Sequence, residues 1–242
     1  MTDPLADLAR VEGVPSALAA ARAAVDVILR DRGMRTVTAA DRAEAMLASA
    51  RASAELAGWD VGTPEAAGVA RMLTELPALA ELILVAPGQV LARMHALWGR
   101  GIVDDDTLGR PRADPGVTAR LVGVYDLLTA PTEASIIVRA AVAHAEVITI
   151  GPFDSGNGVV ARAVEQAILM AGGLDPRGVI VVPAGHLAAG ESYGATVRGY
   201  ADGGLLGVRR WLEHCAAAIT AGAERSPLAA RPVRRRGPDS LI

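Results

Sequence analysis

The stretch HAEVITIGPFDSGNGVVARAVEQAILMAGG, from His144 to Gly173, decides the fold of this chain. The glycines and the proline between Gly151 and Gly158 interrupt a helix that the apolar residues before them would otherwise continue. The run that follows is strongly helical and ends at the Gly172-Gly173 pair. The sequence therefore predicts two helices joined by a tight, glycine-rich loop.

Apolar periodicity and capping residues predict further helices on both sides of this unit. They cover residues 16–32, 39–56, 63–76, 87–98, 117–128, 132–150, 191–200 and 205–223. Val179–Val182 is either a short β-like run or a buried connector. The longest break is the polar stretch GIVDDDTLGRPRADPG, residues 101–116. We therefore expect an all-α fold, with no strands long enough for a substantial sheet.

The composition excludes several classes of protein. Of the 242 residues 51% are apolar and 3% aromatic, which excludes disorder for most of the chain and predicts a core of Ala, Leu, Val and Ile. The net charge of −3 does not indicate a nucleic-acid-binding protein. The single cysteine, Cys215, excludes a disulfide within the chain. No signal peptide or membrane-spanning run is visible, so we expect a cytoplasmic protein.

The loop Gly156-Asn157-Gly158 has a direct physical use. Glycines permit positive φ angles, so that successive backbone N–H groups can converge on an anion, and the following helix adds the positive end of its dipole. Arg162, one turn into that helix, can direct its guanidinium towards the same anion. From these residues alone, an ordinary glycine turn before a helix remains the alternative to an anion site.

The stretch from His144 to Arg162 resembles the signature of the Fic (Fido) domain family. In that signature a histidine-containing helix leads into His-Pro-Phe-x-Asp/Glu-Gly-Asn-Gly-Arg-x-x-Arg. The residues that match in register are His144, Ile150, Pro152, Phe153, Gly156, Asn157, Gly158 and Arg162. The resemblance implies a Fic-like helical bundle over residues 39–224. An N-terminal helical segment, 1–38, would precede it, and a disordered arginine-rich tail, 225–242, would follow it.

The departures from this signature concern catalysis. Family enzymes transfer AMP, or another phosphate-containing group, from a nucleotide to a protein hydroxyl, with the motif histidine as general base. Here that position is Gly151, the metal-binding acid is Ser155, and the first motif arginine is Val159. The resemblance thus implies a catalytically degenerate domain that is not an active protein adenylyltransferase. The neutral Ser155 also argues against a Mg²⁺ site.

Two further segments resemble regulatory parts of the family. Ser53-Ala54-Glu55-Leu56-Ala57-Gly58 resembles an inhibitory helix with the pattern Ser/Thr-x-x-x-Glu-Gly, in which the glutamate pairs with the second motif arginine. With Ala57 in place of that glutamate, Arg162 is expected to be free for a bound anion. Active relatives also carry a β-hairpin flap beside the motif. Only RPRADPG stands between Gly109 and Val117, so we expect that flap to be reduced or absent.

The remaining polar residues are assigned to structural roles. Asp154 is expected to face solvent or cap a helix, with a substitute catalytic group as the alternative. His144 is expected to be partly buried and bonded to the backbone, and Glu146 and Glu165 to be surface charges. Three histidines lack the spacing of zinc ligands, and no metal site is expected: His95, His186 and His214.

The sequence therefore predicts a degenerate Fic-like protein that binds a nucleotide such as ATP, or another anion, through Gly156–Gly158 and Arg162. Its role would be regulatory or partner-binding. Two alternatives stay open: a divergent nucleotidyl- or phosphotransferase that uses Asp154, and a purely structural interaction module. A protein partner and a homodimer are compatible with the alanine-rich helical surface, whereas nucleic acid and membrane are not expected as partners.

Overall fold

The chain folds entirely into helices in the computed structural model, which describes residues 3–31 and 37–229. Those residues form twelve α-helices and one π-helical turn, and they contain no strand, which confirms the predicted all-α class. The elements are α1 (Pro4–Ala9), α2 (Val14–Asp26), η1 (Val27–Asp31), α3 (Ala39–Glu55), α4 (Pro64–Thr74), α5 (Leu76–Leu82), α6 (Pro87–Gly99), α7 (Pro115–Thr129), α8 (Ile136–Ile150), α9 (Asn157–Ala171), α10 (Val182–Ala188), α11 (Glu191–Ala201) and α12 (Leu205–Glu224).

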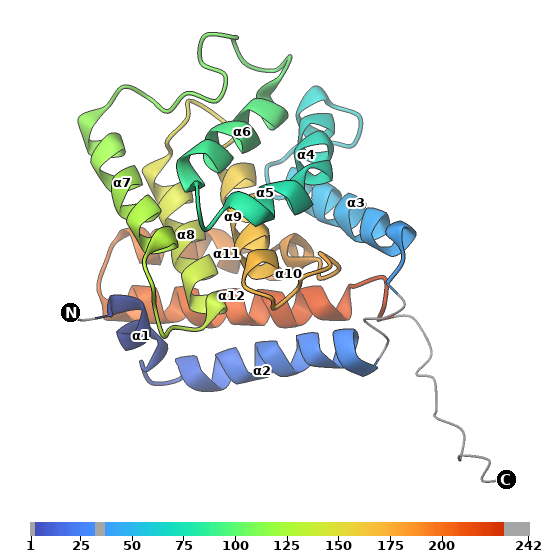
Figure 1. Ribbon diagram of the computed structural model, residues 1–242, viewed down its shortest axis with the longest axis vertical. Helices are drawn as coiled ribbons and strands as arrows, with labels where there is room; N and C mark the ends of the chain where they lie inside the picture. The colour runs from blue at the N-terminus through green and yellow to red at the C-terminus, as the bar shows by residue number, and fades with distance from the viewer. Residues whose placement is uncertain (1–2, 32–36, 230–242) are drawn as a thin grey trace, which may run out of the picture.

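Helices α8 and α9 pack against each other at the centre of the molecule (Figure 1). Both are buried on nearly all sides, as expected for helices that are apolar around most of their circumference. Alanines bring the two helices close because their side chains are short, and fully buried examples are Ala140, Ala143, Ala161 and Ala167. The predicted helix–loop–helix unit is therefore confirmed, and it forms the core around which the other helices are placed.

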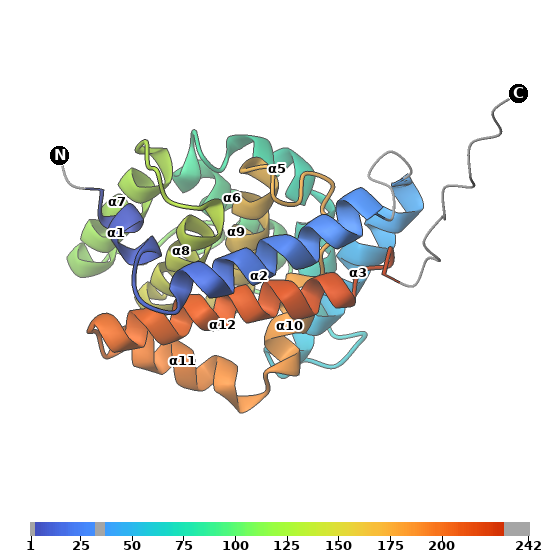
Figure 2. The same ribbon diagram turned by 90° about the horizontal axis from the view of Figure 1, so that it is seen from below.

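The two terminal parts of the chain come together on one side of this core. Helix α2 runs beside α12 along its length (Figure 2), and α10 and α11 also pack on α12. The segment 1–38 thus contributes a helix to the same packed body as the segment 39–224, and the boundary between them stays a prediction. Most of the predicted tail, residues 230–242, lies outside the described residues.

Proline placement explains where one predicted helix divides. The predicted helix over 63–76 begins as expected, with the Thr63 hydroxyl accepting a hydrogen bond from the Ala66 N–H. It ends at Thr74, and α5 starts at Leu76 with Pro77 in its first turn. Proline lacks the N–H that a helix interior needs but fits the first turn, where that N–H would have no partner. Pro77 therefore begins a helix and does not merely interrupt one.

The structure also corrects or decides the prediction for several other segments. Helix α8 begins at Ile136 behind the Ser135 cap, because Thr132 is used elsewhere: its hydroxyl donates to the Asp3 carboxylate at 2.8 Å. Residues 179–181 form a buried connector, which decides between the two interpretations of that run. The short helices α1 and α10 were not predicted, because segments this short carry little periodicity.

The connection between α6 and α7 contains no strand in the described structure, as expected for a reduced or absent flap. The Arg112 N–H donates to the Pro152 carbonyl at 2.8 Å, so this connection lies directly against the α8–α9 loop. Across residues 3–31 and 37–229, no helix combines the length and apolar content that crossing a membrane requires.

Candidate functional site

The loop between α8 and α9 is shaped by two glycines in left-handed conformations. Gly151 ends α8 with φ +57°, and Gly156 precedes α9 with φ +72°. A Cβ atom on Gly156 would lie 2.3 Å from the Trp98 ring, so the close approach of this indole requires glycine as well as the φ angle does. A Cβ atom on Gly151 would have no neighbour nearer than 3.7 Å, so space is present where the family places its histidine.

Asn157 holds the loop closed through its side chain. Its Oδ1 accepts a hydrogen bond from the Phe153 N–H at 2.9 Å, and its Nδ2 donates to the Phe153 carbonyl at 2.7 Å. Phe153 itself is buried and stacks on the His95 ring, with 3.9 Å between ring centroids. The predicted role of Asn157 in an anion site is therefore a backbone-shaping one in this structure, because its amide is committed to Phe153.

Helix α9 begins without a side-chain cap, because Gly156 stands at the N-cap position. The first N–H groups of a helix have no partner within the helix, and the helix dipole makes this end electropositive. Gly156, Asn157 and Gly158 are partly exposed, so an anion in solution can reach these N–H groups. This geometry is compatible with the predicted anion site at Gly156–Gly158.

Arg112 supplies a cation beside the loop that sequence reasoning did not single out. Its Nε donates to the Gly151 carbonyl at 2.9 Å and its Nη2 to the Ile150 carbonyl at 3.2 Å. The same Nη2 would be 3.9 Å from a Cβ atom on Gly151. The guanidinium thus complements the negative end of the α8 dipole and leaves its side chain exposed next to the position of the missing histidine.

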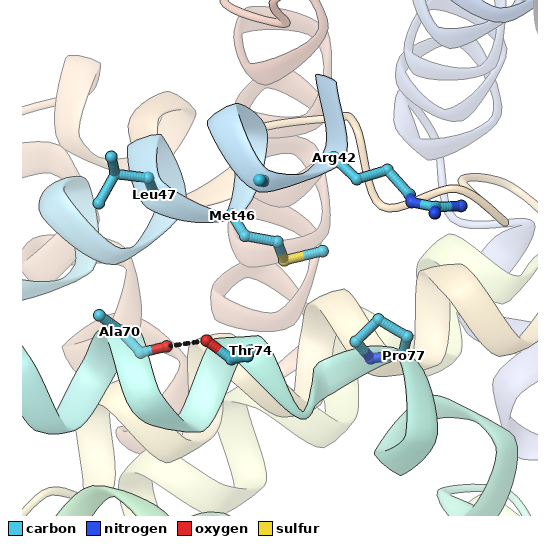
Figure 3. Close-up of a pocket in the computed structure, with 7 residues that line it drawn as sticks. Arg42, Met46, Leu47, Ala70, Thr74 and Pro77 are labelled. Carbon is cyan, nitrogen blue, oxygen red and sulfur yellow. Dashed lines mark hydrogen bonds between the residues drawn. The ribbon is translucent and has the colours of Figure 1, made fainter. Parts of the chain in front are cut away.

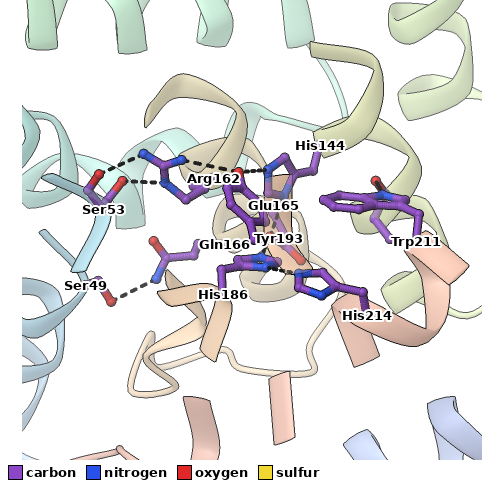
Figure 4. Close-up of polar contacts among 11 residues, drawn as sticks. Ser49, Ser53, His144, Arg162, Glu165, Gln166, His186, Tyr193, Trp211 and His214 are labelled. Carbon is purple, nitrogen blue, oxygen red and sulfur yellow. Dashed lines mark hydrogen bonds and ion pairs between the residues drawn. The ribbon is translucent and has the colours of Figure 1, made fainter. Parts of the chain in front are cut away.

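Arg162 does not point freely into the loop, and the expectation that it lacks an intramolecular partner is wrong. Its Nε donates to Ser53 Oγ and its Nη2 to the Ser53 carbonyl, both at 2.8 Å (Figure 4). The residue is 2% exposed, and a buried guanidinium must find such acceptors because desolvation is costly. Its Nη1 would lie 3.3 Å from a Cβ atom on Gly158, so the cation sits directly behind the loop.

The predicted degenerate inhibitory motif therefore contacts Arg162 through its first residue. Ser53 is buried on α3, whereas Ala57 and Gly58 follow the end of that helix and are exposed. Although residue 57 is alanine and not glutamate, Arg162 is still hydrogen-bonded, because the hydroxyl and the carbonyl oxygen of Ser53 are its acceptors. The assignment of Ser53, Ala57 and Gly58 to an inhibitory helix stays a prediction.

The three positions at which the sequence departs from the Fic signature lie in different environments. Gly151 is partly exposed, Ser155 is exposed, and Val159 is 1% exposed within the apolar core. Asp154 is exposed, as expected. A hard divalent cation prefers several oxygen ligands, including carboxylates. The neutral hydroxyl of Ser155 does not replace the carboxylate that the signature has there, so this position does not fit a Mg²⁺ ion.

Glu165 is the centre of a polar cluster on the other side of Arg162, and its assignment to the surface is wrong. Its Oε2 is 2.7 Å from His144 Nδ1 and 2.8 Å from His186 Nε2, and all three side chains are at most 1% exposed (Figure 4). The expectation that His144 bonds to the backbone is therefore also wrong. Burial by itself raises the pKa of Glu165, but the two histidines outweigh burial and hold that pKa below its ordinary value.

The cluster continues at both ends through further hydrogen bonds. Tyr193 accepts from Arg162 Nη1 at 3.2 Å and can donate to His144 Nε2 at 3.0 Å. His214 Nε2 can donate to His186 Nδ1 at 3.0 Å. Burial lowers the pKa of His144 to about 4, and burial together with His186 lowers the pKa of His214 to about 4. One polar chain thus runs from Arg162 to His214 through Tyr193, His144, Glu165 and His186.

One signal in the sequence could have revealed this cluster. Arg162, Glu165 and Gln166 stand at positions i, i+3 and i+4 of an otherwise apolar helix, so they share one face. His144 likewise interrupts the apolar sequence of α8. Since both helices are predicted to be central, these polar residues had to find partners inside the fold.

A separate apolar groove lies between α3 and α4 (Figure 3). Its lining comes from these two helices and the start of α5, and includes Met46, Leu47, Ala70 and Pro77, with Arg42 beside them. None of these residues belongs to the α8–α9 loop. Leu47 is 46% exposed, so apolar surface is accessible on the helix that also carries Ser53.

No family model and no curated protein matches the sequence. Solved structures do resemble the fold. A Fic family protein from Desulfovibrio desulfuricans G20 superposes with a TM-score of 0.66 at 21% identity, covering 86% of this chain and 73% of that chain. A fragment of Fic-1 from C. elegans gives 0.61 at 19% identity, with coverages of 89% and 74%. A variant of that fragment gives 0.59 at 22%, with coverages of 86% and 72%. The chain therefore has the Fic fold.

Proposed function

We propose that this Fic-fold protein binds a nucleotide phosphate or another anion at the start of α9 without catalysing adenylyl transfer, and that binding serves a regulatory or partner-binding role. The observation that carries the proposal is the uncapped, partly exposed N-terminus of α9 at Gly156–Gly158, with the Arg112 cation beside Gly151. Backbone N–H groups and an arginine are both suited to phosphate oxygens.

The proposed absence of adenylyl transfer rests on the lack of an accessible histidine at the loop. Gly151 has no side chain to accept a proton. His144 and His186 are fully buried behind α9, where both ring nitrogens of each are hydrogen-bonded. His95 is buried under Phe153, and His214 belongs to the same cluster as His186. A general base must lie within hydrogen-bonding reach of the proton that it removes, and these histidines do not meet that condition.

Isothermal titration calorimetry tests the ligand part of the proposal. We would titrate the full chain with ATP, ADP, GTP, coenzyme A and inorganic phosphate, and compare the wild type with Arg112→Gln. The matched control is Arg110→Gln, an exposed arginine two residues earlier in the same connection. We expect binding that weakens severalfold in Arg112→Gln and is unchanged in Arg110→Gln. Absence of binding for all five ligands would overturn the anion site.

The catalytic part needs a separate experiment. The protein would be incubated with labelled ATP, Mg²⁺ or Mn²⁺, and a cell lysate, and protein-bound label would be measured. We expect none. Label transfer that disappears in Asp154→Ala would instead establish a divergent transferase with Asp154 as a participating residue.

The groove between α3 and α4 supports the partner-binding part of the proposal. Its apolar lining and the exposed Leu47 can receive an apolar segment of a partner protein or of a second copy of the chain. Size-exclusion chromatography with light scattering, applied to the wild type and to Leu47→Arg, would measure self-association. A homodimer through this face should dissociate in Leu47→Arg.

A further inference from the structure

The buried cluster behind α9 brings together donor atoms that commonly bind transition metals. His144 Nδ1, His186 Nε2 and a carboxylate oxygen of Glu165 all lie within 4.8 Å of one another. They come from three different helices, α8, α10 and α9, so their convergence is a property of the packed fold. Two imidazoles and one carboxylate are a frequent ligand set for zinc in proteins.

One observation separates this cluster from an ordinary hydrogen-bonded one. Glu165 Oε1 is buried and has no hydrogen-bond partner in the described part of the chain, which is costly for a carboxylate oxygen. A cation bound between the two imidazole nitrogens and the carboxylate would satisfy this acceptor.

The groups around the cluster also match what a metal site requires. In metal sites the ring nitrogen that does not bind the ion is held by a hydrogen bond, which fixes the orientation of the imidazole. His144 Nε2 is 3.0 Å from the Tyr193 hydroxyl, and His186 Nδ1 is 3.0 Å from His214 Nε2. The Trp211 ring packs against His144 with 5.0 Å between centroids (Figure 4), which keeps water away from the donors.

We propose that His144, Glu165 and His186 bind one zinc ion that ties α8, α9 and α10 together. Each imidazole then carries its proton on the nitrogen facing Tyr193 or His214. The Tyr193 hydroxyl and His214 Nε2 accept these hydrogen bonds, and His214 carries its own proton on Nδ1. Two ligands of tetrahedral zinc lie ~3.3 Å apart, so the present N···O contacts of 2.7 and 2.8 Å open by about half an ångström.

Metal analysis of the full chain tests this proposal. The protein would be purified without a metal-affinity step and also refolded with Zn²⁺ or Co²⁺, because the donors are buried and the ion must enter before the core closes. Elemental analysis should give about one metal per chain. The Co²⁺ form should show visible d–d bands, and removal of the metal should lower the unfolding temperature.

Variants locate the ion. Glu165→Gln and His186→Gln, which both keep a polar side chain in the cluster, should each lose the metal, and circular dichroism would check that both stay folded. The matched control is Glu146→Gln, which alters a half-buried glutamate of α8 that bonds to Arg120 and Tyr200 and should keep the metal. A folded wild type that takes up neither metal would overturn the proposal and leave a hydrogen-bonded cluster. Metal retained in both Glu165→Gln and His186→Gln would also overturn it.

Discussion

Polar groups in two neighbouring regions of α9 lie in opposite environments. At the loop, Gly156, Asn157 and Gly158 leave backbone N–H groups near solvent and offer no charged side chain. One turn further along, Arg162 and Glu165 are almost fully buried, and their charges are held by serine, tyrosine and histidine partners. A polar group near water can stay without a protein partner, whereas a buried one destabilises the fold unless it is bonded. The charged side chains of α9 thus bond to partners in the interior. An anion at the loop would have only the backbone N–H groups and Arg112 to bind.

The largest expected effect comes from breaking the buried region. Glu165→Leu would leave His144 and His186 facing an apolar side chain, and removing one partner of a buried polar cluster typically costs ~3–5 kcal/mol of unfolding free energy. Denaturant unfolding followed by circular dichroism would measure the loss. Glu146→Gln, on the same side of the core but half-buried, should cost less than ~1 kcal/mol. Equal effects of the two substitutions would mean that burial does not distinguish these glutamates.

A slightly smaller effect is expected from the loop. Gly156→Ala would force a side chain into positive φ and against the Trp98 ring, for a combined loss of about 3 kcal/mol. The control is Gly173→Ala, which has a similar φ of +74° but no atom within 4 Å of the new Cβ and should lose ~1–2 kcal/mol. The difference between the two unfolding free energies isolates the contact with Trp98. If the two losses agree, close approach is not a reason for glycine at residue 156.

The pH dependence of the unfolding free energy tests the buried region separately from the loop. The pKa of His214 is lowered to about 4 in the folded protein, so between about pH 4 and 6.5 the unfolded chain binds a proton that the folded chain does not. Stability from this histidine is therefore fully present above pH 6.5 and is lost as the pH falls. Between pH 7 and pH 5 the wild type should lose about 2 kcal/mol more than His214→Gln.

The comparison between wild type and His214→Gln also removes the influence of other groups. Burial raises the pKa of Asp175 to about 7, which acts in the opposite direction over the same pH range, but Asp175 is present in both proteins. Unfolding free energies at several pH values provide the measurement. Parallel pH profiles would show that His214 is protonated equally in both states.

The smallest expected effect lies at the junction between the two regions. Ser53→Ala removes the hydroxyl acceptor of Arg162 Nε and keeps the Ser53 carbonyl, so the loss should be about 1–2 kcal/mol. The same variant tests whether Arg162 can contribute to anion binding at the loop. If the cation can turn towards an anion once it is released, phosphate binding to Ser53→Ala should strengthen severalfold. An unchanged affinity would confine Arg162 to the interior and leave Arg112 as the cation of the site.

Local rules explain how much of the fold could be predicted. The Thr63 cap, the glycines at 151 and 156 and the apolar sequences of α8 and α9 act over a few residues, so the helix–loop–helix unit and most helix ranges follow from them. The short α1 and α10 do not, because they are held by packing. Gly156 stands before α9, and Asn157 and Gly158 begin that helix, whereas Arg112 is placed beside them by a connection with no regular pattern.

By itself the sequence determined that the protein is all-helical and that a glycine-rich loop joins two apolar helices, and it predicted that the side chains of Fic catalysis are replaced at residues 151, 155 and 159. Only the tertiary structure decided which partners the buried charged side chains have. Arg162 meets Ser53 across 109 residues, and Glu165 meets His144 and His186, each 21 residues away, on two other helices. Spacing along the chain cannot show these pairs, because they form only when packing excludes water and each buried polar atom must find its partner on another helix.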